Sequence, residues 1–417
     1  MTNFYFKDNT YSSSKKLNKI HYLITITLIA IQTFYPLKAI IPSIIIIPIY
    51  FIWLIISCIS DRSYLFKLIS KTYILIYFIL WITIRVILSN NIDFSYFGMI
   101  NVIISFVNLF IYYSIYIFIS NIDLSQKRKL ILSILIFLIV TNILSIYYVT
   151  KDENAIRYAK SNLYFGVGDF ELVYSVVLLI PILIFCSYKY FKNIKIGIRR
   201  ILIIEIIVSI ILILKANYMT AIVMTVYMIP CVIYLGKNNK ILKFFMFQIF
   251  ILLGVFIIKN LIIEACLYII NNTSIFSEII NTKIMAIANF LSGGGAVDTI
   301  DNRMELSNIS FNTFINNPLI GVDFSQYGRT VIGSHATWVD SLARFGIIGV
   351  SIIIVFLYKI FKNIVSNCKN KLDRNCIIIS IFGFLILGFI NNNMMSGVFV
   401  VIFIVAPFMS SILRYEK

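Results

Sequence analysis

The chain has little charge. Only 13% of its 417 residues are Asp, Glu, Lys or Arg, against about 25% in an average soluble domain. Apolar residues make up 60% of the sequence, and the mean hydropathy is +0.93. Long apolar runs recur along the whole chain, which is typical of a protein that crosses a membrane many times. The composition therefore excludes an ordinary soluble enzyme.

Histidine and cysteine are also scarce. The chain has two His and six Cys, and no two cysteines form a C-x-x-C pair. The two histidines, His21 and His335, are too far apart in sequence to offer zinc-ligand spacing. The cysteines fall in or near apolar runs, which favours small core residues over a disulfide framework. We expect neither a metal nor an organic cofactor.

The apolar runs predict about twelve transmembrane helices when a span is taken as about 20 residues. The predicted spans are approximately 20–35, 40–60, 72–89, 98–120, 130–149, 171–190, 200–214, 218–236, 243–263, 346–363, 375–391 and 396–413. No internal repeat and no Pro- or Ser-rich linker divides the chain. We therefore predict an all-α polytopic membrane protein with one integral membrane domain, residues 1–417.

Lysine and arginine alternate between loops. Basic residues gather in the loops around 61–71, 126–129, 189–200, 237–243 and 359–374, whereas the loops 90–97 and 392–395 have none. This pattern predicts that both termini are cytoplasmic. The net charge of +18 then sets membrane topology, so we expect no nucleic-acid partner. We also expect no cleaved signal peptide, because no small-residue cleavage site follows the first apolar run.

Two predicted outer loops are long, 150–170 and 264–345, and the second has room for short helices. Within it, residues 301–317 predict a helix capped by Asn302 and ended by Pro318. Arg303 would lie in its first turn. Met304, Phe311, Phe314 and Ile315 share one face and Leu306 and Ile309 point away, so the helix is predicted to pack on two sides, against the bundle and against the loop.

A turn-rich stretch follows, punctuated by three glycines, and then comes His335. Ser334 is predicted to cap a short helix from about His335 to Gly346. A histidine at a helix N-terminus feels the positive end of the helix dipole, which keeps it neutral and able to accept a proton. The alternative is a loop histidine that makes only a structural hydrogen bond.

Cations on the predicted outer side form another informative set. They are Arg85, Arg157, Lys160, Lys215, Arg303, Arg329 and Arg344. Such a set suits an anionic head group, above all a lipid-linked pyrophosphate, although single exposed cations are more often just solvated. Arg85 lies near the end of a span, where a cation costs about 2.5–3.5 kcal/mol. It either faces the bundle interior or extends to the outer interface.

The polar segment of the second long loop resembles a known family. RMELSNISFNTFINNPLIGVDF, from Arg303, and SHATWVDSLARFGIIG, from Ser334, are similar to the signature region of the O-antigen polymerase and O-antigen ligase superfamily (Wzy-type proteins). The matching positions are Arg303, Asn317, Pro318, Gly321, His335, Leu342, Gly346 and Gly349. This chain departs from the family pattern at Ala336, where Asn is frequent, at Arg344, near an often acidic position, and at Lys215, where Arg is frequent.

The resemblance implies a GT-C-like glycosyltransferase architecture in the cytoplasmic (inner) membrane of a bacterium. The implied reaction polymerises undecaprenyl-pyrophosphate-linked oligosaccharide repeats into a capsule or O-antigen on the outer face, without a metal. His335 and Arg303 would be catalytic, and Arg157, Lys215, Arg85 and Arg303 would bind the pyrophosphate. The fallback bases are Asp169, Glu171, Asp301 and Asp323. A flippase and a chain-length regulator are the implied protein partners.

Other functions remain open from the sequence. A ligase of the same superfamily, which transfers finished polymer to an acceptor, shares the motifs. A flippase or transporter of lipid-linked oligosaccharides predicts cations around a central cavity and internal pseudo-symmetry. A channel would need rings of pore-lining residues from several copies. The long 264–345 loop favours the glycosyltransferase.

Overall fold

The structure is a computed structural model that describes residues 6–41, 43–60, 62–88, 99–159, 164–190, 194–216, 218–237, 241–272, 281, 284–285, 288, 292, 298–322, 331–368 and 370–413. Within this part of the chain every regular element is a helix, so the all-α prediction is confirmed. In chain order the helices are α1 (Phe6–Thr33), α2 (Tyr35–Ile40), α3 (Ser43–Ser60), α4 (Arg62–Leu88), α5 (Met99–Asn121), α6 (Leu124–Lys151), α7 (Phe170–Tyr190), α8 (Ile196–Lys215), α9 (Met219–Lys237), α10 (Ile241–Ile257), α11 (Lys259–Asn272), α13 (Asp298–Asn316), α14 (Thr337–Asn367), α15 (Lys371–Ile390), α16 (Ser396–Val400), the π-helical η3 (Val401–Val405), α17 (Ala406–Phe408) and α18 (Ser410–Leu413).

Several of these helices are suited to cross a membrane. Six are long and apolar enough to span a bilayer, and three apolar stretches are shorter, Pro48–Ser60, Met219–Tyr234 and Ser396–Phe408. The chain is therefore a membrane protein by length and composition of its helices. Each of the predicted spans overlaps a helix. The count of twelve, the large outer loop and the orientation of the termini stay predictions.

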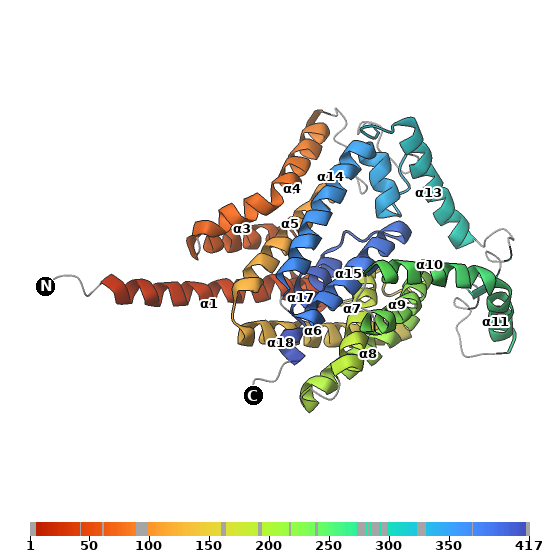
Figure 1. Ribbon diagram of the computed structural model, residues 1–417, viewed down its shortest axis with the longest axis horizontal. Coiled ribbons are helices and arrows are strands. Elements are labelled where there is room, and N and C mark those ends of the chain that lie inside the picture. Colours follow the sequence, from red (N-terminus) through yellow and green to blue (C-terminus); the bar gives the residue numbers. More distant parts are fainter. Residues whose placement is uncertain are drawn as a thin grey trace.

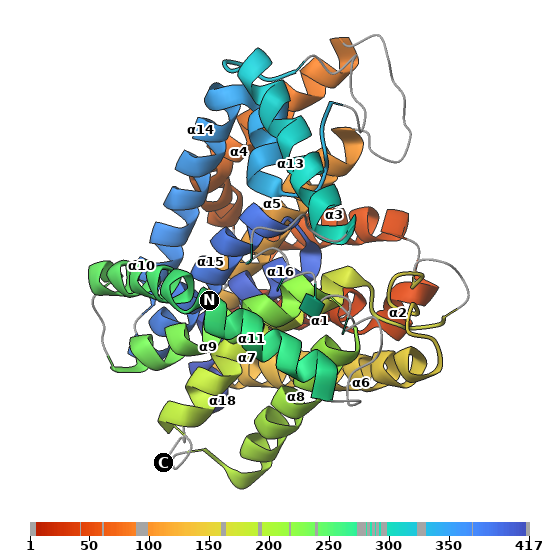
Figure 2. The same cartoon turned by 90° about the vertical axis from the view of Figure 1, so that its right-hand side faces the viewer.

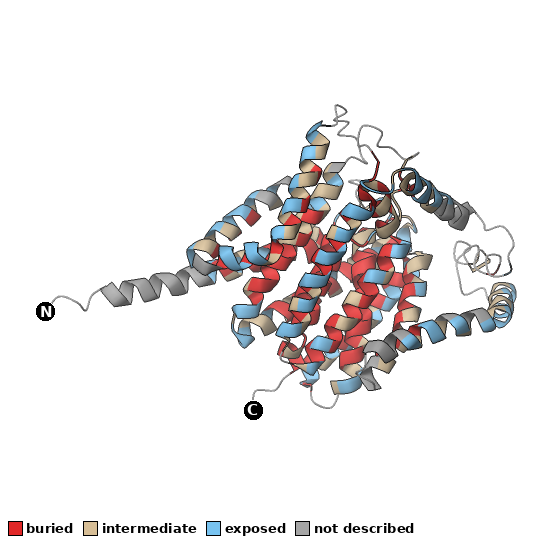
Figure 3. Cartoon of the chain, turned by 45° about the horizontal axis from the view of Figure 1, so that its top comes forward, coloured by how far each residue is buried: buried red, intermediate tan, exposed pale blue. Residues whose placement is uncertain are grey.

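The core lies around α7 and the C-terminal segment Ser396–Leu413. Figure 3 shows buried residues gathered in the central helices, with exposed residues on the outer ones. Helix α7 packs against α8, α9, α15 and α16, and its side chains from Leu172 to Leu183 are all buried. Because it is covered on all sides, its sequence is apolar all round rather than amphipathic.

Helix α14 breaks at Gly346. This residue has φ 60° and ψ −169°, a left-handed conformation that favours glycine. A Cβ here would lie 2.4 Å from the Leu319 carbonyl oxygen. The residues beyond the break donate backbone bonds to the preceding loop, from Ile347 to Pro318 O (2.8 Å) and from Ile348 to Leu319 O (3.1 Å). The predicted end of a short helix at Gly346 is therefore a kink into which residues 318–322 dock.

Helix α13 lies beside α14 in both views (Figures 1 and 2). It ends before Pro318, as predicted, but it begins at Asp298. The predicted cap at Asn302 is therefore wrong, and Arg303 belongs to the second turn. Of the two sides predicted to pack, the one with Phe311 and Ile315 is largely open, since these side chains are 50% and 56% exposed, whereas Leu306 and Ile309 on the other side are half-buried. The helix packs instead through its polar Ser310 side, because that side meets residues 331–333 and α14.

Candidate functional site

Helix ends from distant parts of the chain meet at what we call the distal end, where α7, α9, α14 and α16 begin. Asn391 donates from Nδ2 to the Tyr174 hydroxyl (2.5 Å), which shares a hydrogen bond with the Thr220 hydroxyl (2.5 Å). The Thr337 backbone N–H donates to the Asn391 carbonyl (3.4 Å). Three helix N-termini are thus joined through one asparagine after α15.

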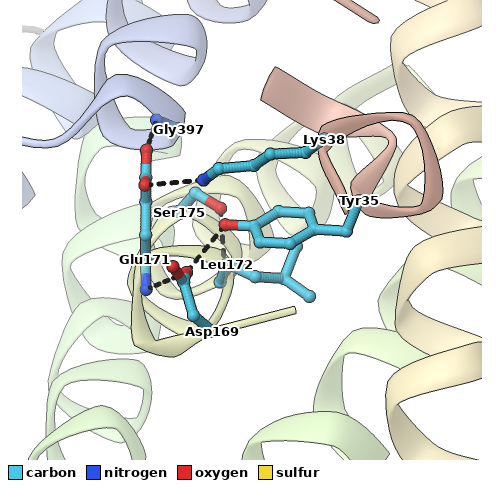
Figure 4. Close-up of polar contacts among 7 residues, drawn as sticks. All are labelled: Tyr35, Lys38, Asp169, Glu171, Leu172, Ser175 and Gly397. Atoms are coloured by element: carbon cyan, nitrogen blue, oxygen red, sulfur yellow. Dashed lines mark hydrogen bonds and ion pairs between the residues drawn. The ribbon is translucent and has the colours of Figure 1, made fainter. Parts of the chain in front are cut away.

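A cluster of charged and polar side chains continues from there (Figure 4). Lys38 Nζ lies 3.0 Å from Glu171 Oε2, and the Gly397 N–H donates to Glu171 Oε1 (2.6 Å). The Tyr35 hydroxyl donates to Asp169 Oδ1 (2.9 Å). Asp169 also accepts from the Glu171 N–H (3.0 Å), as an acidic residue does at a helix N-terminus. We call these five residues the Lys38 cluster; they tie α2, α7 and α16 together.

The charges of the Lys38 cluster fix two protonation states. Burial alone would lower the pKa of Lys38, but the carboxyls of Glu171 and Asp169 outweigh it and raise that pKa. Burial, reinforced by the same two carboxyls, holds the pKa of Tyr35 well above its usual range. At neutral pH Lys38 is therefore an ammonium and Tyr35 a neutral hydrogen-bond donor.

The loop that carries His335 is anchored on α13. The Gly333 N–H donates to Ser310 Oγ (2.9 Å), and the Ser310 hydroxyl donates to Asp340 Oδ1 (2.6 Å). A Cβ at Gly333 would lie 2.0 Å from the Leu306 carbonyl oxygen, so only glycine allows this approach. One serine therefore positions both the loop and the first turn of α14.

Ser334 is strained. Its φ is 57°, a conformation that costs a residue with a side chain about 1–3 kcal/mol and that often marks functional sites. Arg344 donates from Nη2 to the Ser334 hydroxyl (3.3 Å). This bond gives a role to Arg344, one of the positions at which the chain departs from the family pattern.

His335 follows Ser334 and is partly exposed. Ser334 does not cap α14, since the helix begins at Thr337 with Ala336 in the cap position and no side-chain cap bond. The prediction of a Ser334 cap is wrong because the left-handed turn directs that hydroxyl to Arg344. His335 stands two residues before the helix, and Thr337 joins it to the distal end.

The predicted cations differ in their surroundings: Arg85 is bonded to a loop, whereas Arg157 and Lys215 are exposed. Arg85 donates from Nη1 to Ile320 O (2.9 Å) and from Nη2 to Val322 O (3.0 Å), so it holds the loop that docks into the α14 kink. Arg157 is exposed in the turn after α6, and Lys215 is the exposed last residue of α8.

Some predicted residues lie outside what the structure describes. Arg303 and Asp301 have a described helical backbone only. Position 303 lies two turns before Ser310 on the same face of α13. Lys160, Asp323 and Arg329 lie outside the described residues altogether.

Sequence reasoning missed Lys38 and Tyr35. A signal existed, because Lys38 lies between the spans 20–35 and 40–60, in a segment that the charge pattern places outside. A basic residue that breaks the positive-inside pattern is a reason to look for a carboxylate partner.

No protein-family model and no curated protein matches the chain. Among the described residues, no group of three or more His, Cys, Asp or Glu side chains converges as metal ligands would. The functional argument therefore rests on the motif between Arg303 and Gly349 and on the geometry of the distal end.

Proposed function

We propose that the protein polymerises undecaprenyl-pyrophosphate-linked oligosaccharide repeats into a surface polysaccharide, a capsule or an O-antigen, on the outer face of a bacterial cytoplasmic membrane. The observation that carries this proposal is the strained Ser334–His335 turn, fixed by Ser310 and Arg344. It stands at the end of an apolar helix bundle where polar side chains gather. A bundle of this kind suits a substrate with a lipid tail and a polar head.

The proposed reaction is a single displacement. A sugar hydroxyl of the acceptor repeat attacks the anomeric carbon of the donor glycan, and His335 accepts the hydroxyl proton as general base. The new glycosidic bond forms as the bond to pyrophosphate breaks, which inverts the anomeric centre. The leaving lipid pyrophosphate carries away the electron pair.

Cations would stabilise the leaving group. Arg303 and Arg157 are the first candidates, followed by Lys215 and Arg85. The two hydrogen bonds of Arg85 to loop carbonyls leave its positive charge in place, so it can add to the local potential while it holds the loop.

Glu171 is the second candidate for the base. It lies at the distal end, but both its oxygens already accept hydrogen bonds, from Gly397 and Lys38. A carboxylate with both oxygens occupied is a less available base, and Glu171 lies outside the motif between Arg303 and Gly349, which favours His335.

The test combines a deletion with purified protein. A deletion strain should carry single repeat units on its surface instead of a ladder of polymer lengths. In a lipid-linked substrate assay, His335→Ala and Arg303→Ala should each lose polymer formation by about 100-fold or more. Full activity of both variants would contradict the proposed site.

The same strains separate the other functions. A ligase deletion would leave polymer that is not attached to its acceptor, and a flippase deletion would leave lipid-linked repeats on the cytoplasmic side of the membrane.

A further inference from the structure

A carboxyl group lies in the interface between α6 and α8, in the middle of the bundle. Glu205 is fully buried, as are Asn142 and Ser209 beside it. Asn142 donates from Nδ2 to Glu205 Oε1 (3.1 Å), and the Ser209 hydroxyl donates to the same oxygen (3.1 Å). The Asn142 amide also lies within hydrogen-bond distance of Ser209 Oγ (3.3 Å).

Two oxygens of this cluster are left over. Glu205 Oε2 and Asn142 Oδ1 are both buried, and neither has a hydrogen-bond partner among the described residues. The neighbouring donors are already used, since the Asn142 amide and the Ser209 hydroxyl point at other oxygens. The described ion pairs include no partner for Glu205. A charged, unpaired carboxylate at this place would cost several kcal/mol.

We propose that Glu205 binds a proton and donates it to Asn142 Oδ1. The carboxylic acid and the amide then form a pair of opposed hydrogen bonds, from Asn142 Nδ2 to Oε1 and from Glu205 Oε2 to Oδ1. A protonated carboxyl is both donor and acceptor. One proton therefore satisfies both oxygens and removes the charge from the membrane interior.

A divalent metal ion fits this place poorly. Calcium takes six to eight oxygen ligands and magnesium six in octahedral array, whereas the cluster offers only the oxygens of Glu205, Asn142 and Ser209. Oε1 already accepts two hydrogen bonds. The ligand class is thus a proton.

The protonated Glu205 would hold α6 and α8 together. On α6, the neighbouring Thr141 accepts from the Tyr35 N–H (3.3 Å), and Ser145 accepts from the Gly168 N–H (2.9 Å). On α6, Asn142 therefore positions α8 through its bond to Glu205. Thr141 and Ser145 position the segments that carry the Lys38 cluster, through Tyr35 and through Gly168 next to Asp169. The inference concerns helix packing and stands whether or not the proposed reaction is right.

Infrared spectroscopy of the full chain in lipid nanodiscs at neutral pH tests the proposal. The wild type should show the carbonyl band of a protonated carboxylic acid, above the amide band in frequency. Labelling with 13C-glutamate should shift this band, and E205Q should abolish it. The matched control E153Q, at an exposed position, should retain it.

Thermal unfolding supplies a second readout. E205Q should melt close to the wild type, because a glutamine amide can replace both hydrogen bonds of the neutral acid. E205A should melt several degrees lower, since it leaves Asn142 Oδ1 without a partner and opens a cavity.

Three results would overturn the proposal. The first is a labelled wild type without the shifted band, and the second is a band that survives in E205Q. The third is a melting temperature that sodium chloride raises in the wild type but not in E205Q, while choline chloride raises neither. The last result would assign the site to a sodium ion. If E205Q fails to fold, the labelled wild-type spectrum alone decides.

Discussion

The two histidines of this chain occupy different surroundings. His21 is 2% exposed and lies between the rings of Phe118 and Trp53, with centroid distances of 3.9 and 5.0 Å. His335 is partly exposed, on a loop that follows a strained residue. One histidine is part of a packed core, and the other follows a strained turn at the distal end, where its Nε2 is buried although the residue is partly exposed.

The imidazole of His21 contacts the Ser57 hydroxyl. The Ser57 hydroxyl donates its only hydrogen to Trp53 O (2.9 Å). With that hydrogen used, the 2.7 Å contact with His21 Nε2 fits a bond that the imidazole donates. The indole of Trp53 in turn donates to Thr25 (2.8 Å). His21 thus has a fixed structural task, so position rather than residue type separates a core histidine from a catalytic candidate.

The largest expected effect separates the two histidines directly. His335→Ala should lower polymer formation about 100-fold or more, the loss of a general base, with little change in thermal stability. His21→Ala should cost about 2–4 kcal/mol of stability, with an unchanged rate per folded molecule. The measurement is the lipid-linked assay normalised to the folded fraction from size-exclusion chromatography.

Equal losses of specific activity in the two variants would contradict the assignment of a structural role to His21 and a catalytic role to His335. A stable, fully active His335→Gln would do the same, because glutamine cannot act as the base.

The second effect tests whether the α14 kink holds the loop of residues 318–322. Gly346→Ala places a methyl group against Leu319 at a left-handed position, which should cost about 3 kcal/mol. The control is Gly254→Ala in α10, where no atom beyond its chain neighbours and the local helix backbone lies within 4 Å of the new Cβ; it should be neutral or stabilising by about 0.5–1 kcal/mol. Melting temperatures measure both.

Hydrogen exchange localises the damage. In Gly346→Ala the amides of Ile347 and Ile348 should lose protection, because their acceptors lie on the displaced loop. Unchanged protection would show that residues 318–322 move with the helix, and glycine would then not be required at the kink.

Sequence patterns predicted the helices well and the site less well. The apolar runs located the helices because backbone groups in a bilayer must bond within their own helix. The end of α13 before Pro318 was also predictable, since proline cannot continue a helix. The break at Gly346 was predictable only as a helix end, because the same helix resumes one residue later.

The contacts between distant segments were not predictable. The bonds from Arg85 to Ile320 and Val322 cross more than 200 positions of sequence, and no local pattern encodes such a contact. Ser334 looked like a helix cap because Ser is a good cap in isolation; the bond from Arg344 decides otherwise. Lys38 and Glu171 form their pair because α2 and α7 meet in space.

The third effect tests whether the ion pair of Lys38 and Glu171 stabilises the distal end. The side chains of Lys38 and Glu171 are 27% and 14% exposed, between a surface pair and a buried one. A double-mutant cycle of Lys38→Met and Glu171→Gln should therefore give a coupling energy of about 1–2 kcal/mol. The control cycle replaces Glu171 by Gln with the exposed Lys151→Met and should give no coupling; equal coupling in both cycles would argue against a specific pair.

The smallest expected effect concerns Arg85, which bonds the loop of residues 320–322 and is also a candidate for the proposed pyrophosphate site. Arg85→Lys keeps the charge but replaces a planar group that bonds two carbonyls with a point donor. If Arg85 mainly holds the loop, the variant should lose about 1 kcal/mol of stability and keep polymer formation within about tenfold. Thermal unfolding and the lipid-linked assay on the same preparation measure the two quantities. A loss of activity as large as that of Arg303→Ala, without loss of stability, would instead place the Arg85 guanidinium on the leaving group. Arg85 would then belong to the proposed reaction site rather than to the packing of the loop.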